Sequence, residues 1–144
     1  MSFMFESNEN LAYLNIANFD TSKVEKMDYM FSRCYRITSI DVSHFNTNSL
    51  LSMTYMFNYC FSVLYLDLSK FNTSKITDMT DVFSYCESLT SLDVSSFDTS
   101  QVTRMSGSFY SCKKLERLDV SKFNTSSVNY MSGMFGYCES LTSL

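Results

Sequence analysis

The cysteines are the residues of this sequence best suited to chemistry, because a thiolate can attack carbon, pair as a disulfide or bind a metal. Five of them recur at intervals of 26 residues, at Cys34, Cys60, Cys86, Cys112 and Cys138. No Cys-x-x-Cys pair occurs and His44 is the only histidine, which argues against a metal site. Stacked coils would bring neighbouring Cα atoms within disulfide range, roughly 5 Å, but with all side chains pointing into the core. We therefore expect a buried column of free thiols that pack as small hydrophobic groups.

Four aspartates keep the same interval and could bind a cation: Asp41, Asp67, Asp93 and Asp119. In stacked coils neighbouring carboxylates would lie roughly 5 Å apart and repel one another, so some group must offset their charge. The alternatives are a cation strip, hydrogen bonds to the backbone between coils, and the nearby Lys70 and Lys122. No other carboxylates recur beside this column to complete an oxygen cage for calcium. Hydrogen bonding to the backbone is therefore the favoured prediction, and the cation strip is the weaker one.

No arrangement of residues in the sequence points to catalysis. His44 has no recurring acid or nucleophile beside it, and a glycine-rich phosphate-binding loop is absent from the sequence. A regular repeat also leaves little irregular loop in which a pocket could be built. We expect a protein without enzymatic activity and without a cofactor.

Positions that change from one repeat to the next are better candidates for specific binding than positions that stay the same. One such outward column reads Tyr13, Ser39, Tyr65, Ser91 and Arg117, and another reads Asn18, His44, Lys70, Ser96 and Lys122. Tyrosine and arginine are frequent anchors in protein interfaces. We expect Tyr13, Tyr65 and Arg117 to contact a protein or glycan partner. Further candidates are His44, Lys70 and Lys122, and an ordinary solvated surface is the alternative.

The composition is that of one folded domain, with 144 residues, of which 45% are hydrophobic and 18% charged. A net charge of −4 argues against a nucleic-acid partner, which needs a basic face. No apolar window reaches the roughly 18 residues of a transmembrane helix, and Met1 does not begin a signal peptide. The repeat pattern is under way at Met4 and still running at Leu144, so we expect a piece of a longer repeat protein.

The elements that position these residues follow from the repeat itself. Columns of phenylalanine and methionine keep the interval without insertion or deletion, at Phe19, Phe45, Phe71, Phe97 and Phe123, and at Met27, Met53, Met79, Met105 and Met131. A period of this length predicts a solenoid, in which each repeat is one coil stacked on the last. We expect one repeat domain over residues 1–144 with about five and a half coils, in the register 4–29, 30–55, 56–81, 82–107, 108–133 and a partial 134–144.

Each coil contains two periodicities. Alternation of apolar and polar residues predicts a short strand with Leu92 and Val94 facing inward. The following stretch has apolar residues three and four apart, at Val102, Met105, Phe109 and Cys112. This spacing predicts one face of a helix of about ten residues, with Ser100 as its N-cap. The expected class is α/β, with one short parallel strand and one short helix per coil. A β-solenoid, in which another strand or a 3₁₀ segment replaces the helix, is the alternative.

A long phrase in the repeat carries a family resemblance. Leu-x-x-Leu-Asp-Val-Ser-x-Phe-Asn/Asp-Thr-Ser-x-Val-x-x-Met-x-x-Met-Phe-x-x-Cys runs from Leu115 to Cys138, and from Leu89 to Cys112 with Ser108 in the second methionine position. It closely resembles the BspA-like leucine-rich repeat family over essentially the whole chain. The first coil departs from the phrase at Asn8, Asn15 and Ala17.

The resemblance implies a right-handed leucine-rich-repeat-like solenoid at the cell surface or in a secreted protein. It also implies an adhesin-like interaction module, which would bind a host protein or glycan through the exposed strand face. The family has no established catalytic residues to carry over. A structural spacer, or a stalk that self-associates end to end through uncapped sheet edges, is the alternative. We expect neither a nucleic-acid partner nor membrane insertion.

Overall fold

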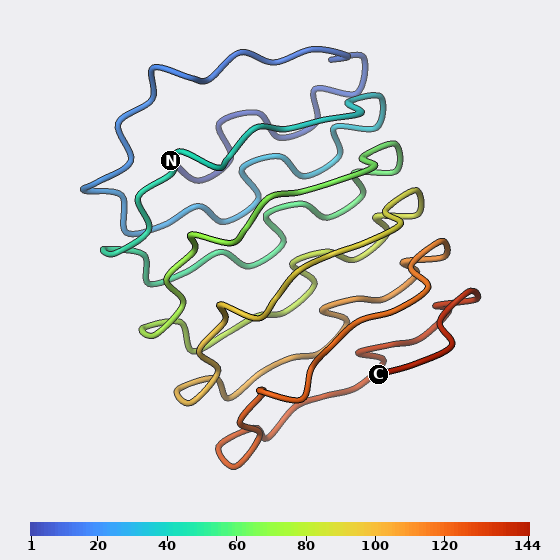
Figure 1. Ribbon diagram of the computed structural model, residues 1–144. Coiled ribbons are helices and arrows are strands. Elements are labelled where there is room, and N and C mark those ends of the chain that lie inside the picture. Colours follow the sequence, from blue (N-terminus) through green and yellow to red (C-terminus); the bar gives the residue numbers. More distant parts are fainter.

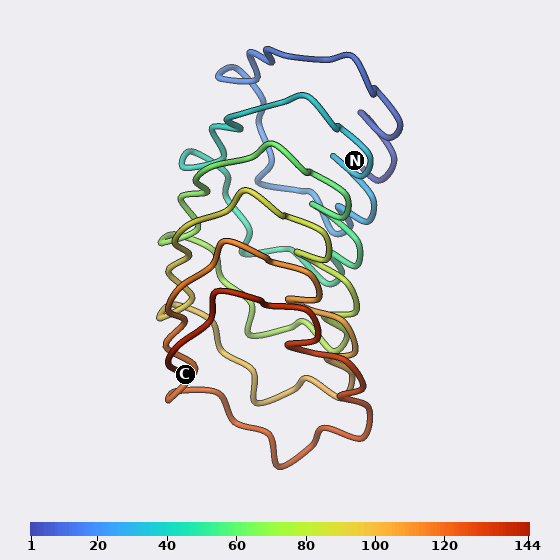
Figure 2. The ribbon, with the colours of Figure 1, turned by 90° about the vertical axis from the view of Figure 1, so that its right-hand side faces the viewer.

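The structure is a computed structural model that describes residues 1–144, and the chain winds through it as a stack of similar coils (Figure 1). The colours run from a blue coil at one end to a red coil at the other, so coils that are consecutive in sequence are neighbours in space. The view turned by 90° shows the same order (Figure 2). The predicted solenoid of stacked repeats is confirmed.

Neighbouring coils are aligned in the register of the sequence repeat. Every β-bridge of the structure is parallel and joins two residues that are 26 positions apart. The bridges form two columns, one with Lys26↔Ser52, Asp78↔Arg104 and Arg104↔Tyr130, and the other with Ser39↔Tyr65 and Arg117↔Ser143. Residues in the same column of the sequence alignment therefore lie side by side along the stack.

The helix predicted between Val102 and Cys112 is wrong, because the structure contains no helix and no strand longer than an isolated bridge. The segment is instead a run of overlapping turns. Alternate N–H groups donate to the carbonyl three residues earlier, at 2.9–3.3 Å, from Ser108, Tyr110 and Cys112. The N–H groups between them donate to carbonyls of the next coil, at 2.7–3.0 Å, from Gly107, Phe109 and Ser111. Each turn N–H therefore donates a hydrogen bond either within its own coil or to the next coil.

The spacing between coils explains why a turn ladder replaces the helix. The buried phenylalanine rings of successive coils are only 5.5–5.8 Å apart. Packed helices need an axis separation of about 8–10 Å, so one helix per coil would force the stack to fan open. The turns require two residues per coil in the left-handed region, such as Tyr55 and Tyr59, each with φ of 58°. The coil therefore resembles the β-solenoid alternative more than the predicted α/β coil, although its strands are reduced to single bridges.

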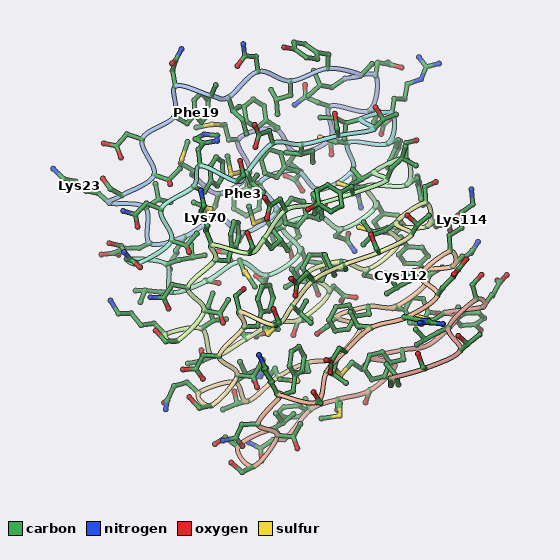
Figure 3. The ribbon with its side chains drawn as sticks, viewed as in Figure 1. Phe3, Phe19, Lys23, Lys70, Cys112 and Lys114 are labelled. Carbon is green, nitrogen blue, oxygen red and sulfur yellow. The ribbon has the colours of Figure 1, made fainter.

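The core consists of columns of identical side chains. One cluster of 34 buried hydrophobic residues fills the stack, and its largest members are the fully buried Phe31, Phe57, Phe83 and Phe109. These four rings lie nearly parallel, with interplanar angles of 5–13°. The four residues that suggested a helix face are all completely buried, so the prediction of which residues face inward is correct. Figure 3 shows the interior filled with side chains while Lys23 and Lys114 project from the edges.

Buried threonines join the coils at one corner of the stack. Thr21 Oγ1 accepts the N–H of Asn46 at 2.8 Å and donates to the carbonyl of Asn46 at 3.1 Å. Thr99 makes the same pair of contacts with Asn124, at 2.7 and 3.1 Å. A single hydroxyl therefore satisfies two backbone groups of the next coil, which is the use expected of a buried polar side chain. None of the segments forms a helix that could cross a membrane.

Candidate functional site

The cysteine column is a structural feature rather than a reactive one. All five cysteines are free, and each thiol donates to the carbonyl of a phenylalanine in the preceding coil, as Cys86 does to Phe57 at 3.3 Å. Burial raises the pKa of Cys34 to about 11 and raises the pKa of Cys60, Cys86 and Cys112 further above the ordinary value. The thiolate, which is the nucleophile and the metal ligand, is therefore disfavoured at neutral pH. The prediction of free thiols is confirmed, and their burial is confirmed for four of the five, because Cys138 is half-buried.

The four aspartates of the candidate cation strip each close a turn in their own coil. Asp41 Oδ1 accepts the N–H of Ser43 at 3.1 Å and its hydroxyl at 2.7 Å, and Asp67 does the same with Ser69 at 3.0 and 2.7 Å. Hydrogen bonds from the serine side chain and backbone lower the pKa of all four carboxyl groups. These contacts are made within a coil, whereas the sequence suggested contacts between coils. One carboxylate oxygen of each aspartate is thus used by its serine.

The basic residues of the second variable column lie on the surface. His44 Nε2 is 3.0 Å from the carbonyl of Ile16 in the preceding coil, and its ring meets Phe45 edge-on at 5.0 Å. Lys70 and Lys122 are exposed beside the aspartate column, where their charge helps to lower the pKa of neighbouring aspartates. His44 is therefore held by the fold, while the two lysines remain accessible.

The structure brings part of the predicted partner-binding face together around Tyr65. A hollow of about 440 Å³ is lined by Tyr65, Leu64, Asp41 and Asp67, among others. Tyr65 is 58% exposed and Leu64 is 53% exposed, so two large apolar side chains face solvent beside two carboxylates. Arg117 lines a separate, smaller hollow of about 240 Å³ with Asp119.

Tyr13 is strongly exposed at the same column position, but it lines neither of these hollows. The three predicted anchors therefore share a face without converging on one site.

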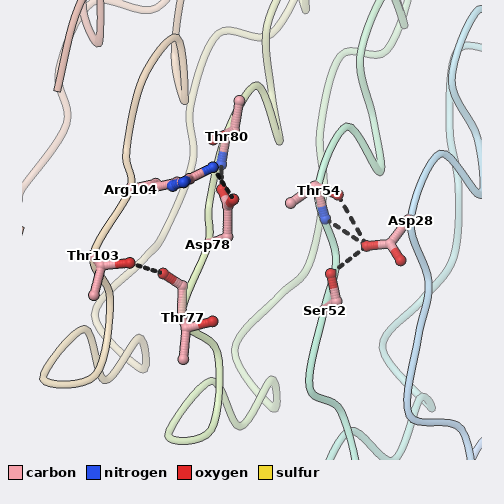
Figure 4. Close-up of polar contacts among 8 residues, drawn as sticks. All are labelled: Asp28, Ser52, Thr54, Thr77, Asp78, Thr80, Thr103 and Arg104. Atoms are coloured by element: carbon pink, nitrogen blue, oxygen red, sulfur yellow. Dashed lines mark hydrogen bonds and ion pairs between the residues drawn. The ribbon is translucent and has the colours of Figure 1, made fainter. Parts of the chain in front are cut away.

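Another set of charged residues joins neighbouring coils (Figure 4). Asp28 Oδ1 accepts the hydroxyl of Ser52, and the N–H and hydroxyl of Thr54 at 3.1 and 3.0 Å. Two coils further on, the guanidinium of Arg104 lies 4.0 Å from Asp78. Each contact links one coil to the next, so these charges stabilise the stack.

A groove lined by tyrosines lies on the stack and was not predicted from the residue pattern. Two short stacks of parallel rings line it, with Tyr29 and Tyr55 at 4.6 Å and Tyr59 and Tyr85 at 4.3 Å between centroids. The groove has a volume of about 350 Å³ and shares no lining residue with the hollow around Tyr65. We call it the tyrosine groove. The sequence signal for it was the spacing, because both pairs are 26 residues apart. In the structure all four tyrosines hold left-handed turn positions of the turn ladder.

Comparison with known proteins gives the chain a family. The profile of the family described as "Mycoplasma protein of unknown function, DUF285" matches residues 1–64 and again residues 60–143. No curated protein and no solved structure matches the chain. The two matches together span nearly the full length of the chain. The chain therefore belongs to the DUF285 family of proteins of unknown function.

Proposed function

We propose that this chain is a non-enzymatic interaction module that binds a host protein through the face around Tyr65. The observation that carries the proposal is the exposed pair Leu64 and Tyr65 beside the carboxylates of Asp41 and Asp67. A rigid aromatic anchor next to an aliphatic one is typical of interface hot spots. The resemblance to BspA-like leucine-rich repeats supports a surface-exposed, adhesin-like role.

The chemistry of this face selects for a partner with a basic group. The pKa values of Asp41 and Asp67 are lowered by their serine hydrogen bonds, so both carboxylates are charged at neutral pH. Each has one oxygen engaged by a serine and is exposed or only partly buried. A partner that places an apolar side chain on Tyr65 and an arginine or lysine between the carboxylates would satisfy both features.

A binding experiment with a matched control tests the proposal. The purified chain is screened against arrayed extracellular-matrix proteins and glycans, and the affinity for each hit is measured with Tyr65→Ala and with Leu64→Ser. We expect each substitution to lower affinity at least about tenfold, as for a hot-spot residue. Tyr137→Ala, which removes an exposed tyrosine elsewhere on the stack, should bind like the wild type. The proposal fails if the array yields no protein ligand, or if both variants keep full affinity.

A self-stacking stalk is the second candidate, and one observation favours it. Each coil bonds to the next through its backbone, as the Phe57 N–H does to the carbonyl of Val82 at 2.9 Å, and two copies of the chain could join by the same contacts in the same register. Light scattering over a concentration series distinguishes the two: polymers that grow with concentration support the stalk, and a constant monomer mass excludes it.

A further inference from the structure

The floor of the tyrosine groove is built from polar side chains that are buried at the same position in three successive coils. Ser32 is 1% exposed, Asn58 is 6% exposed and Ser84 is 1% exposed, and all three line the groove. The interval between them is 26 residues. The fold therefore repeats a buried polar group under the groove, where most interior columns repeat apolar ones.

The side chains of the groove floor make few hydrogen bonds within the protein. The only side-chain hydrogen bond among them is the long one from Asn58 Nδ2 to the Ser84 carbonyl at 3.5 Å. The hydroxyls of Ser32 and Ser84 and the Asn58 Oδ1 bond to no other group of the protein, and because no fully buried polar atom of the chain lacks a partner, these three atoms are open to the groove. The hydroxyl of Ser108, an equally buried serine elsewhere in the core, lies 2.8 Å from two carbonyl oxygens that can share its one proton. These accessible donors and acceptors can bond to water or to a polar ligand that enters the groove.

The walls and rim add further polar groups. Burial raises the pKa of Tyr29, Tyr55 and Tyr59, and the carboxylate of Asp81 raises it further. The three phenols therefore remain protonated and can both donate and accept hydrogen bonds at neutral pH. Arg33 also lines the groove and supplies the opposite charge. Seven of its ten lining residues are tyrosine, serine or asparagine.

The groove continues along the stack rather than ending as a closed pocket. A second hollow of about 360 Å³ shares Asp81, Ser84 and Tyr85 with the first. It extends to Gly107 and Gly133, which occupy the wall position that is tyrosine in two earlier coils. With a rise of about 4.8 Å per coil, the joined hollows could accommodate a linear ligand. An extended peptide strand is disfavoured, because alternate turn N–H groups already bond to the next coil and leave no free edge.

We propose that the tyrosine groove binds a linear, uncharged oligosaccharide that lies along the stack. Sugar hydroxyls both donate and accept hydrogen bonds, as do the serine, asparagine and tyrosine groups that predominate in the groove. Because the groove tyrosines stack face to face, at 4.6 and 4.3 Å between centroids, they contribute chiefly their hydroxyl groups to such a ligand. The site is independent of the surface around Tyr65.

Direct titration tests the proposal. The probes are hexamers of β-linked glucose, N-acetylglucosamine and mannose, with spermine and hexalysine as cationic probes. Binding is followed by calorimetry and by tyrosine fluorescence, which is usable because the chain has ten tyrosines and no tryptophan. We expect at least one hexasaccharide to bind saturably. Asn58→Leu should then lower affinity about tenfold, and Tyr59→Phe, which removes only a hydroxyl, about three- to tenfold.

Controls separate loss of the site from loss of the fold. Tyr130→Phe removes an exposed hydroxyl outside both hollows and should leave affinity unchanged. Circular dichroism and the melting temperature check each variant, and Tyr59→Phe provides the decisive result if Asn58→Leu does not fold.

Three results would overturn the proposal. In the first, no hexasaccharide binds. In the second, a hexasaccharide binds with an affinity that Tyr59→Phe and Asn58→Leu do not change. In the third, spermine or hexalysine binds while the sugars do not, which would assign the groove to cations.

Discussion

At the scale of single residues, the same short-range contact closes two turns in almost every coil. Asp67 and Asn72 each accept the N–H of the residue two positions later, at 3.0 and 3.1 Å. Asn15 keeps this contact in the first coil, at 3.1 Å to Ala17, although it replaces the aspartate of the repeat. Aspartate and asparagine are therefore interchangeable for the geometry of the turn, and they differ in charge. Without proline, and with only three glycines, the chain relies on these side chains for its turns.

This contact predicts how stability depends on pH. The pKa of Asp41, Asp67, Asp93 and Asp119 lies below the ordinary value of 3.8 in the folded chain, because serine donates to each carboxylate. The unfolded chain therefore binds protons first as pH falls, and the stability that the shift contributes is lost through and below about pH 3.8. We expect the free energy of unfolding in urea to be flat between about pH 5 and 7 and to fall below about pH 4.

Replacing the same four aspartates with asparagine provides the control. Asn72 and Asn124 show that an amide oxygen closes an equivalent turn, so the variant should fold. Its unfolding free energy should fall less steeply with acid than that of the wild type. An unchanged acid dependence would mean that these carboxylates do not carry the effect.

At the scale of the coil, the residue spacing predicted correctly which side chains are buried, but it predicted a helix where the chain forms turns. Val102, Met105, Phe109 and Cys112 are all buried, as the spacing indicated. A run of turns that returns every three or four residues gives the same spacing as a helix, so periodicity alone could not distinguish them. The distinction depends on inter-coil distance and on left-handed residues such as Tyr85, with φ of 61°. Neither can be read from residue type, because tyrosine does not mark this conformation as glycine does.

The tyrosine groove was missed for a related reason. Its walls stand on left-handed turn residues, and its floor is hidden in a segment that was interpreted as helical. On a helix, Tyr55 and Tyr59 would share a face with no groove between them. Only the turn ladder places Asn58 beneath them.

Gly107 provides a test of the turn ladder. It occupies a left-handed position, with φ of 62°, and an added Cβ would lie 2.2 Å from Asp81 Oδ1. We expect Gly107→Ala to destabilise the chain by about 1–3 kcal/mol, mainly from the left-handed backbone and in smaller part because the flexible Asp81 side chain must rotate away. Chemical denaturation measures the change.

Gly133→Ala is the matched control, because φ there is 65° and the nearest atom is 3.4 Å away. It should cost only the backbone penalty, about 1–2 kcal/mol. Combining Gly107→Ala with Asp81→Ala should recover most of the difference. Equal costs for the two glycine variants would show that Asp81 does not occupy the space above Gly107.

At the scale of the whole molecule, stability is distributed between neighbouring coils. Backbone hydrogen bonds, thiol contacts and threonine contacts all join one coil to the next, at separations of 25–29 residues. Contacts inside one coil are confined to its turns. The stability of such an array approximates a sum over coils and their interfaces, and each interface contributes only where its two coils are in register.

Removing one coil tests this dependence on register. Deleting residues 82–107 joins Asp81 to Ser108, which stands in the column of Val82, so every later side chain keeps its column. The shortened chain should fold cooperatively and lose one interface, with a melting temperature lower by roughly 5–10 °C. Deleting residues 82–106 removes one residue fewer, and it moves Phe109 from the phenylalanine column into the position of Ser84. That variant should lose the ordered structure of its last coils, and limited proteolysis should cleave it after the junction. If both deletions melted alike, the columns would not be what holds the stack in register.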